Sequence, residues 1–320
     1  MVVTFFINVA LTSAAGTAAA VGAIIIPMLI RIGVHPAAAG TAVFAGTWGN
    51  VLSPGSVHPA FIAKLVNSDP MAIIIGHAKV VCLALALIAA IVFALTLILE
   101  ENKGYVVEGT EDDGESSSFK ANPLMAMVPV IPLVLLVLGS KQIAVLPPIS
   151  VPVAMFAGAA LALALTRKSP QELSRQFFLG MGDAYASVIG LIAAAAAFTQ
   201  GMSSIGLTGA LIDIMKHSTD VARLGASLGP LLVAFLSGSG DAATLAFNGS
   251  VTPEAARFGF DTAKMGSLAF IAGTLGRTMS PVAAACIISA RLAGVGPVDL
   301  AKRTAPAMMA ATILCTLMLL

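Results

Sequence analysis

Charged side chains are scarce in this sequence. Lysine, arginine, aspartate and glutamate make up 10% of the 320 residues, whereas soluble domains contain about 25%. Hydrophobic residues make up 58%, and the formal net charge is +1. A chain with so little charge cannot cover itself with a polar surface, which excludes a soluble domain. No basic stripe interleaved with aromatic residues occurs either, so no nucleic-acid partner is predicted.

Cysteine and metal-binding patterns are also scarce. The three cysteines stand singly in apolar segments without a CxxC or His/Cys spacing, so neither a zinc site nor a disulfide framework is predicted. The four histidines are scattered, no HExxH motif occurs, and His77 is expected at the membrane interface. We find no nucleophile–base pair and no P-loop. The sequence therefore predicts neither an enzyme nor a nucleotide-driven pump, and no cofactor.

Long apolar segments dominate the chain instead. Each is long enough to cross a hydrocarbon core of about 30 Å as a helix. They cover residues 71–99, 123–139, 148–166, 183–199, 261–276 and 304–320. Thirty glycines and several alanine runs suit close helix packing in lipid. We predict an all-α, multi-pass membrane protein surrounded by lipid.

One segment is strongly polar. Residues 100–122 hold seven acidic and two basic residues, which is typical of a solvated linker. It separates residues 1–99 from residues 123–320. We expect each of these two parts to be one structural repeat.

A short motif interrupts both parts. Residues 46–54 read GTWGNVLSP and residues 273–281 read GTLGRTMSP, with five of nine positions identical. Each motif lies inside an apolar segment, so we predict two discontinuous helices, over 35–66 and 261–293. Non-helical backbone at membrane depth is tolerated only where it is buried in protein or lines a wet cavity. The two breaks are therefore expected to surround one site.

Polar tips precede both breaks. Gly16-Thr17-Ala18-Ala19 matches Gly240-Asp241-Ala242-Ala243, and each stretch follows a short apolar arm. We predict two re-entrant helical hairpins, the second over 221–252, followed by the broken helix and a final helix over 304–320. Weak internal symmetry of this kind is typical of transporters built from inverted repeats.

The two parts differ in length. Residues 123–236 precede the second tip, whereas only about a dozen residues precede the first. If the parts are inverted copies, the first repeat is incomplete. We therefore expect an N-terminally truncated chain, with a genuinely asymmetric protein as the alternative.

The sequence resembles the DcuC family of anaerobic C4-dicarboxylate carriers. The resemblance rests on residues 180–212, SGSGDAATLAF at 237–247, LGRTMSPVAAA at 275–285 and VDLAKRTAPAMM at 298–309. It implies a homodimer in the bacterial inner (cytoplasmic) membrane with a scaffold and a moving transport domain. The implied activity is secondary transport of succinate, fumarate or malate by symport, antiport or exchange, coupled to H⁺ or Na⁺ through an elevator-like movement.

Arg277 and Asp241 are the first candidates for the site. A guanidinium at membrane depth faces a cavity or a partner, and its planar fork suits a carboxylate. Arg277 is therefore a candidate substrate clamp, or else a structural partner of Asp241 or Asp261. Asn50 occupies the place of Arg277 in the first break. Asp241 is a candidate coupling-ion ligand or proton carrier, or a salt-bridge partner of Arg277, and Thr17 is its counterpart.

Hydroxyls and glycines complete the candidate set. The hydroxyls could bind substrate oxygens or Na⁺, or could simply cap helix ends. They belong to Ser13, Ser237 and Ser239 at the tips and to Thr47, Ser53, Thr274 and Ser280 in the breaks. The glycines permit unwinding and close backbone approach near the coupling ion. They are Gly46, Gly49, Gly240, Gly273 and Gly276. No metal other than Na⁺ is expected.

Two other functions remain open. The same fold could carry another organic anion or an amino acid. The chain could also be a non-transporting membrane fragment that binds a dicarboxylate without moving it.

Overall fold

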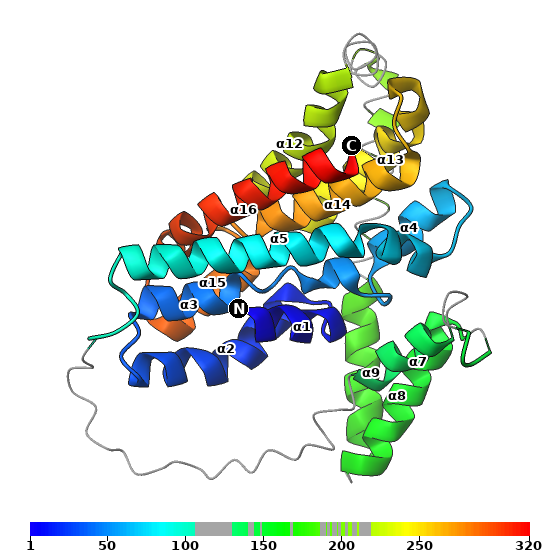
Figure 1. The fold of residues 1–320 in the computed structure, drawn as a ribbon. Helices are drawn as coiled ribbons and strands as arrows, with labels where there is room; N and C mark the ends of the chain where they lie inside the picture. Colours follow the sequence, from blue (N-terminus) through cyan, green and yellow to red (C-terminus); the bar gives the residue numbers. More distant parts are fainter. Residues whose placement is uncertain are drawn as a thin grey trace. The chain divides into compact units, whose positions relative to one another are not determined.

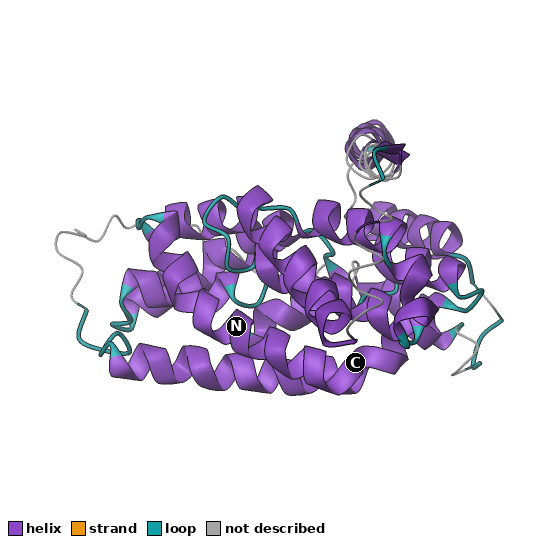
Figure 2. Cartoon of the chain, turned by 90° about the horizontal axis from the view of Figure 1, so that it is seen from above, coloured by secondary structure: helices purple, strands orange, loops and turns teal. Residues whose placement is uncertain are grey.

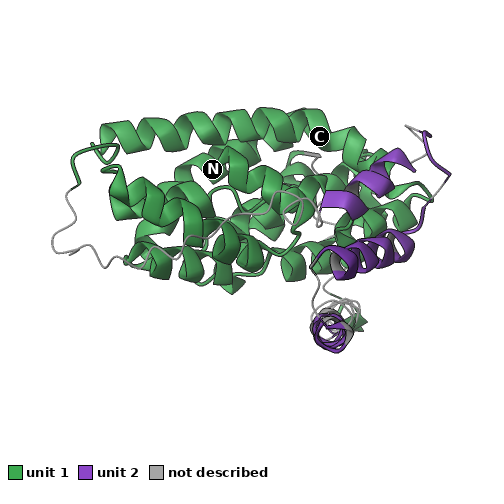
Figure 3. Cartoon of the chain, turned by 90° about the horizontal axis from the view of Figure 1, so that it is seen from below, with its two compact units in different colours: residues 1–106, 193–320 green, residues 107–192 purple. Residues whose placement is uncertain are grey.

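The computed structural model describes residues 1–105, 130–139, 144–147, 149–166, 169–185 and 219–320, with isolated positions between 190 and 210. These residues are helical and include no strand, which confirms the predicted all-α class (Figures 1 and 2). The chain divides into two compact units (Figure 3). One contains Met1–Val106 and Ala193–Leu320, and the other contains Val107–Ile192. The two ends of the chain therefore fold together.

The N-terminal part of the first unit contains two interrupted helical segments and one long helix. Its elements are α1 (Val2–Ala10), α2 (Ala14–Arg31), α3 (Pro36–Phe44), the 3-10 turn η1 (Gly49–Leu52), α4 (Val57–Leu65) and α5 (Pro70–Ile98). Proline at the first positions of α3 and α5 suits helix starts, because its missing N–H would be unpaired there. The first break therefore spans residues 45–56.

The C-terminal part has a similar order of elements. They are α12 (Thr219–Ser237), α13 (Gly240–Ser250), the 3-10 helix η4 (Thr252–Phe258), α14 (Thr262–Arg277), α15 (Ala284–Ala293) and α16 (Pro297–Leu319). Helix α14 continues through residues 273–277 of the predicted interruption and ends at Arg277, so the second break spans only residues 278–283. Helix α16 begins at Pro297, ahead of the predicted residue 304.

The second unit contains α7 (Ile131–Leu138), α8 (Val151–Thr166) and α9 (Pro170–Ala184). The Ser169 side chain caps α9 by accepting a hydrogen bond from Glu172 N at 3.3 Å. Parts of the predicted segments 123–139, 148–166 and 183–199 lie outside the described residues, as do residues 106–122 of the predicted linker.

Helix α14 is the centre of the first unit. Every residue from Met265 to Gly276 is buried, and α14 contacts α4, α5, α12, α13 and α16. A helix that is buried on all sides lies in the core of a larger assembly. Helix α5 differs, because it exposes large apolar side chains such as Phe93 and Ile98 along its length. Such a surface suits contact with lipid.

The helix pairs α1–α2 and α12–α13 contact the two broken helices, α3–α4 and α14–α15, in corresponding ways. Helix α2 contacts α3 of the first broken helix and α15 of the second. Helix α13 likewise contacts α14 of the second broken helix and α4 of the first. Each pair therefore contacts both broken helices, and the polar tips lie next to the breaks.

One residue of the acidic segment, Glu101, is anchored to the helices. Glu101 is 9% exposed and forms an ion pair with Arg303 of α16, whose Nε donates to Glu101 Oε2 at 2.9 Å. Its carbonyl accepts a hydrogen bond from His35 N at 2.9 Å. Glu101 thus joins the end of α5 to α16 and to the turn before α3, whereas Glu100 and residues 103–105 are exposed, as expected of a solvated segment.

Three described helices are long and apolar enough to cross a membrane. They are Ala14–Arg31, Pro70–Ile98 and Asp220–Ser237. Helices α15 and α16 meet the same test as a pair, although the chain bends by 119° between them. These helices support a multi-pass membrane protein.

Candidate functional site

The turn between α12 and α13 forms one side of the candidate site. Gly238 has a φ of +72°, which a residue with a Cβ rarely adopts. Its Cα also faces Val282 and Ala283, where an added Cβ would lie 3.0 Å from backbone atoms. Ser239 Oγ accepts from Ala242 N and Ser237 Oγ accepts from Ser239 N, both at 3.2 Å. Both serines therefore cap this turn, in agreement with the capping alternative.

The turn between α1 and α2 is more closed. Thr17 Oγ1 donates to Leu11 O at 3.0 Å and accepts from Asn8 Nδ2 at 3.1 Å. Ser13 Oγ accepts from Gly16 N at 3.1 Å and caps α2. Thr17 is fully buried, whereas its counterpart Asp241 is exposed. The two tips are thus chemically different.

The first break is held mainly by its backbone. Thr47 Oγ1 donates to Phe44 O at 2.8 Å, and Ser53 Oγ accepts from Gly55 N at 3.3 Å. Asn50 N donates to Asn8 Oδ1 at 3.0 Å, but the buried Asn50 Oδ1 has no partner among the described residues. Trp48 is buried against Phe5, with ring centroids 4.6 Å apart. The one tryptophan is therefore a packing residue.

The second break has its polar side chains at the end of α14. Thr274 Oγ1 donates to Phe270 O at 2.8 Å, and Thr278 Oγ1 donates to Thr274 O at 2.9 Å. The buried Ser280 Oγ has no hydrogen-bond partner in the described part of the chain. Ser280 N donates to Arg277 O at 3.1 Å, which keeps the serine beside the arginine backbone.

Hydrogen bonds between the described residues join the two parts of the sequence at the candidate site. Arg277 Nη2 donates to Thr47 O at 2.8 Å, which connects the two breaks. His58 Nε2, on α4, lies 2.8 Å from Asp241 Oδ1, at the start of α13. The His58 ring also stacks on Phe270 of α14, with centroids 4.3 Å apart. These contacts place Arg277, Thr47, His58 and Asp241 in one region of the first unit.

The alternative ion pairs of Arg277, with Asp241 or Asp261, are not formed among the described residues. Within the described residues, neither Asp241 nor Asp261 lies within ion-pair distance of its guanidinium. Asp261 instead caps α14 by accepting from Lys264 N at 2.8 Å. The Arg277 charge nevertheless acts on Asp241 through space. Among the described residues, Thr47 O accepts from one of the five guanidinium N–H groups, and the others can donate to an anion.

His77 was wrongly predicted at the membrane interface. It is fully buried, with Nε2 2.9 Å from Val51 O and Nδ1 3.1 Å from Ser267 Oγ. Because a carbonyl only accepts, Nε2 must carry a proton and donate to Val51. His77 thereby joins α5 and α14 to a carbonyl of the first break. Neither His77 nor His58 was expected in the site, since their partners are distant in sequence.

The predicted glycines are sites of close backbone approach. A Cβ added at Gly49 would lie 2.0 Å from Phe5 O, and one at Gly276 would lie 2.2 Å from Leu231 O. Gly46 packs in the same way on Met1, and Gly240 and Gly273 pack on each other. The glycines therefore let the helix pairs reach the breaks, and three of them lie within α13 and α14.

The helix ends favour the charges they carry. Arg277 is the last residue of α14 and Asp241 lies in the first turn of α13. A helix stabilises a cation at its C-terminus and an anion at its N-terminus. The described residues contain no group of three His, Cys, Asp or Glu side chains that could hold a metal ion. The arrangement can bind an organic anion through Arg277 and a cation or proton through Asp241.

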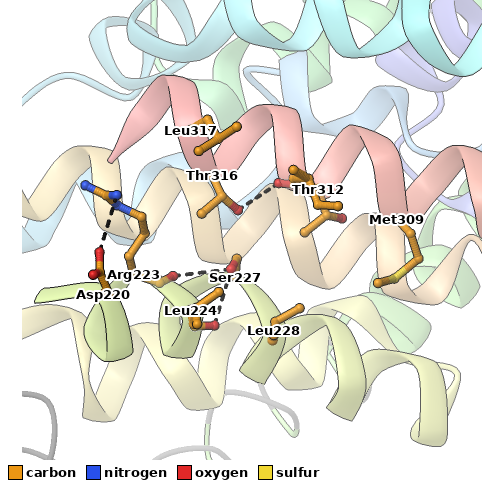
Figure 4. A pocket seen from close by; sticks show the side chains of 10 residues that line it. Asp220, Arg223, Leu224, Ser227, Leu228, Met309, Thr312, Thr316 and Leu317 are labelled. Carbon is orange, nitrogen blue, oxygen red and sulfur yellow. Dashed lines mark hydrogen bonds and ion pairs between the residues drawn. The ribbon is translucent and has the colours of Figure 1, made fainter. Parts of the chain in front are cut away.

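A separate cavity lies between α12 and α16 (Figure 4). It has a volume of about 280 Å³. Arg223 closes one end by donating to Leu320 O at 2.8 Å and lies 3.7 Å from Asp220. Apolar side chains such as Leu224 and Met309 line the remainder. The cavity contains none of the predicted site residues.

Comparisons with known proteins identify similar chains. The family model described as C4-dicarboxylate anaerobic carrier, DcuC, matches residues 1–320. A Haemophilus influenzae protein named only as an uncharacterized transporter is 38% identical over 280 residues, which cover 84% of this chain and all of that protein. The anaerobic C4-dicarboxylate transporter DcuC of Escherichia coli K12 is 34% identical over 130 residues, covering 40% of this chain and 28% of the carrier. A Vibrio cholerae protein described as an anaerobic C4-dicarboxylate transporter DcuC is 27% identical over 316 residues, covering 93% of this chain and 66% of that protein.

Proposed function

Because this chain belongs to the DcuC family of C4-dicarboxylate carriers, we propose that it binds succinate, fumarate or malate between its two helix breaks and moves them across the bacterial inner membrane. The family and its named relatives are transporters, not enzymes. The matched part spans only 28% of the Escherichia coli carrier and 66% of the Vibrio cholerae protein. Transport by this chain is therefore part of the proposal.

The observation that carries the proposal is the position of Arg277. It is half-buried at the end of the central helix and is fixed by Thr47 O, while most of its N–H groups remain available. A carboxylate can accept two parallel hydrogen bonds from such a fork. Ser280 Oγ and Asn50 Oδ1, which have no partner among the described residues, lie in the second and the first break. The Ser280 hydroxyl can donate to the substrate. Asn50 Nδ2 can donate to the second carboxylate, whereas its Oδ1 can only accept, for example from the hydroxyl group of malate.

The proposed architecture is a pair of inverted repeats with re-entrant hairpins α1–α2 and α12–α13. The corresponding contacts of α2 and α13 with both broken helices support it. We further propose a homodimer, an elevator-like movement, and symport or exchange coupled to H⁺ or Na⁺. These features are those that the family resemblance implies.

A second candidate substrate class is supported by Asp241. Its carboxylate is exposed, and the Arg277 charge acts on it. An amino acid could place its carboxylate on Arg277 and its ammonium group on Asp241. The variant Asp241→Asn distinguishes the two substrate classes. It should strongly reduce the affinity for an amino acid and leave the affinity for a dicarboxylate largely unchanged.

The test is succinate binding to the purified chain, measured by calorimetry. Arg277→Gln should weaken binding by about a hundredfold, because it leaves a desolvated carboxylate unpaired. Arg277→Lys should cost about tenfold, because lysine keeps the charge without the fork. Arg257→Gln is the matched control, because Arg257 is exposed and pairs with Glu254 on η4. Equal affinity in the Arg277→Gln and Arg257→Gln variants would refute the proposed clamp.

Transport is measured separately with labelled succinate in proteoliposomes. Uptake that disappears in Arg277→Gln supports the carrier. Binding without any uptake by the unaltered chain would favour the non-transporting alternative.

A further inference from the structure

The cavity between α12 and α16 has a charged end and an apolar body (Figure 4). Asp220 and Arg223 lie at the charged end, near the start of α12, and Leu228 and Met309 line the other end. Residues 220 and 228 are about 12 Å apart along the helix axis. A helix of that length is about 10–12 Å wide, so it does not fit a volume of about 280 Å³. A narrow, chain-like molecule does.

The hydroxyl groups along the cavity are paired within their own helices. Ser227 Oγ donates to carbonyls of the preceding turn at 3.2 Å. Thr312 Oγ1 and Thr316 Oγ1 donate to carbonyls one turn earlier on α16, at 2.9 and 2.7 Å. The apolar side chains Leu224 and Leu317 also line the cavity and are exposed. The body of the cavity therefore suits a hydrocarbon chain, because no hydroxyl proton of these residues is left for a polar ligand.

The position of the cavity along α12 sets its depth in the membrane. The segment Asp220–Ser237 is apolar and long enough to cross, so Asp220 and Arg223 lie at one end of a span. Charged side chains near the ends of such helices reach the head-group region. One leaflet of the hydrocarbon core is about 15 Å thick, so a cavity that follows α12 inward for about 12 Å covers most of a leaflet. This geometry matches the head group and one acyl chain of a lipid.

The two charged side chains contact each other only loosely. Arg223 Nη1 lies 3.7 Å from Asp220 Oδ1, which is too long for a hydrogen bond, and Nη2 donates to Leu320 O at 2.8 Å. The Asp220 side chain is 85% exposed and the Arg223 side chain 32%. Among the described residues, the guanidinium therefore keeps N–H groups that can donate to a phosphate, and the carboxylate can accept from an ammonium group.

Head groups differ in how they match this pair. A phosphate next to a primary ammonium group places its negative charge on Arg223 and its positive charge on Asp220. A quaternary ammonium group has no N–H to donate to the carboxylate. A head group with only a phosphate charge brings a second negative charge beside Asp220. The pair therefore favours a primary-amine head group.

We propose that the cavity between α12 and α16 binds one phospholipid with a primary-amine head group. Its phosphate accepts hydrogen bonds from Arg223, its ammonium group donates to Asp220, and one acyl chain lies between the two helices. The site contains none of the residues assigned to dicarboxylate binding. The inference therefore goes beyond the proposed function and is tested separately from it.

Native mass spectrometry of the purified chain in an uncharged detergent tests the site. Dioleoyl phosphatidylethanolamine, phosphatidylcholine and phosphatidylglycerol are titrated separately, and the lipids bound per chain are counted. The three lipids share their acyl chains and differ only in the head group. We expect one tightly bound phosphatidylethanolamine per chain, with an affinity about tenfold higher than that of either other lipid.

Substitutions of the charged pair separate the two head-group contacts. Arg223→Gln should weaken binding of all three lipids by about tenfold, because each has a phosphate. Asp220→Asn should remove the preference for phosphatidylethanolamine over phosphatidylcholine. Glu254→Gln and Arg257→Gln are matched controls, because these residues form the same kind of ion pair, three residues apart, on η4. Neither control should change the binding of phosphatidylethanolamine.

A substitution in the apolar body tests the position of the acyl chain. Leu228→Trp fills the cavity without changing a charge and should weaken phosphatidylethanolamine binding by about tenfold or more. Val233→Trp, on the same helix but outside the cavity, is the matched control and should leave binding unchanged. Thermal unfolding shows that each variant is folded. Leu228→Trp keeps the test decisive if Arg223→Gln is unstable without its contact to Leu320 O.

Other results contradict the proposal. Equal affinity for the three lipids, or tighter binding of phosphatidylglycerol, would overturn the head-group assignment. Phosphatidylethanolamine binding that is unchanged in Leu228→Trp would place the lipid elsewhere and overturn the site. A dimer that forms without bound lipid and dissociates in Leu228→Trp would show that a second copy of the chain covers this face instead.

Discussion

The first helix break spans residues 45–56 and contains the whole motif Gly-Thr-x-Gly-x-x-x-Ser-Pro. The second break spans residues 278–283 and contains only the C-terminal part of the same motif. In the first, the backbone does the binding: Thr47 O accepts from Arg277, and Val51 O lies 2.9 Å from His77 Nε2. Beside the second break, the Arg277 side chain at the end of α14 donates to Thr47 O, and within the break the buried Ser280 Oγ has no partner among the described residues. One motif thus supplies acceptors from its main chain, and the other supplies donors from its side chains.

This difference follows from the residues at matched positions. Asn50 of the first break corresponds to Arg277 of the second. Asn50 is tied by its backbone to Asn8 of α1 and is 6% exposed, whereas Arg277 extends from the end of α14 to the opposite break. Two copies of a motif can therefore keep the same glycines while one provides backbone acceptors and the other provides side-chain donors. In the proposed site, the first break supplies backbone acceptors, and Arg277, at the end of α14 next to the second break, supplies the positive charge.

The largest expected effect tests what the two breaks share. Gly49→Ala and Gly276→Ala each place a Cβ in steric clash with a backbone carbonyl oxygen. The distances are 2.0 Å to Phe5 O and 2.2 Å to Leu231 O. Backbone cannot move aside cheaply, so both variants should lose several kcal/mol of stability, as overpacked cores do. Thermal unfolding in detergent measures this. Gly76→Ala, which meets no atom within 4 Å on α5, is the control and should be neutral or stabilising.

The next prediction breaks the asymmetry between Asn50 and Arg277. Asn50→Asp introduces a negative charge into the first break and should weaken succinate binding by about 10- to 100-fold, since like charges repel in a poorly solvated site. Asn50→Ala removes only the amide and should cost about tenfold or less. Calorimetric titration distinguishes them. If Asn50→Asp bound succinate as well as Asn50→Ala does, the first break would lie away from the substrate.

A smaller effect separates Ser280 from Ser53. Ser280 Oγ has no partner among the described residues, whereas Ser53 Oγ accepts from Gly55 N. Ser280→Ala should therefore reduce succinate affinity by about tenfold with little change in stability. Ser53→Ala should lower stability by about 1 kcal/mol with little change in affinity. Calorimetry measures the affinity and thermal unfolding the stability. If Ser53→Ala lost affinity and Ser280→Ala lost only stability, the substrate contact would belong to the first break.

The smallest effect concerns Thr47. Its carbonyl holds Arg277, but its hydroxyl donates to Phe44 O within the chain. Thr47→Val should therefore change succinate affinity by less than about twofold, while the buried hydrogen bond it removes costs about 1 kcal/mol of stability. An affinity loss of tenfold or more would show that the hydroxyl, and not the carbonyl, serves the site.

The helical class and the interruptions near both motifs were predictable, because long apolar segments and glycine clusters are local signals. The start of the second break was not. Gly273 and Gly276 suggested unwinding, but they lie in α14, where Leu231 and Thr244 pack too closely for a side chain. Glycine in a membrane helix marks either unwinding or close packing, and only the neighbouring helix decides between them.

The partners of the polar residues were less predictable than the residues themselves. The sequence indicated that Arg277 and Asp241 are charged side chains at membrane depth. Their partners Thr47 and His58, however, come from the other part of the chain. Glu101 was assigned to a solvated linker by its acidic neighbours, yet it binds Arg303. Contacts over such separations leave no local pattern, so a single sequence gives the charges without the pairs.

The separation of these partners also bears on how the protein is made. The His58–Asp241 contact spans 183 residues and the Arg277–Thr47 contact spans 230. At a synthesis rate of about 5–20 residues per second, Asp241 is synthesised roughly 10 to 40 s after His58. Throughout that interval His58 lacks Phe270 and Asp241, and the first break lacks Arg277. Membrane insertion must therefore keep them in protected surroundings until α13 and α14 emerge.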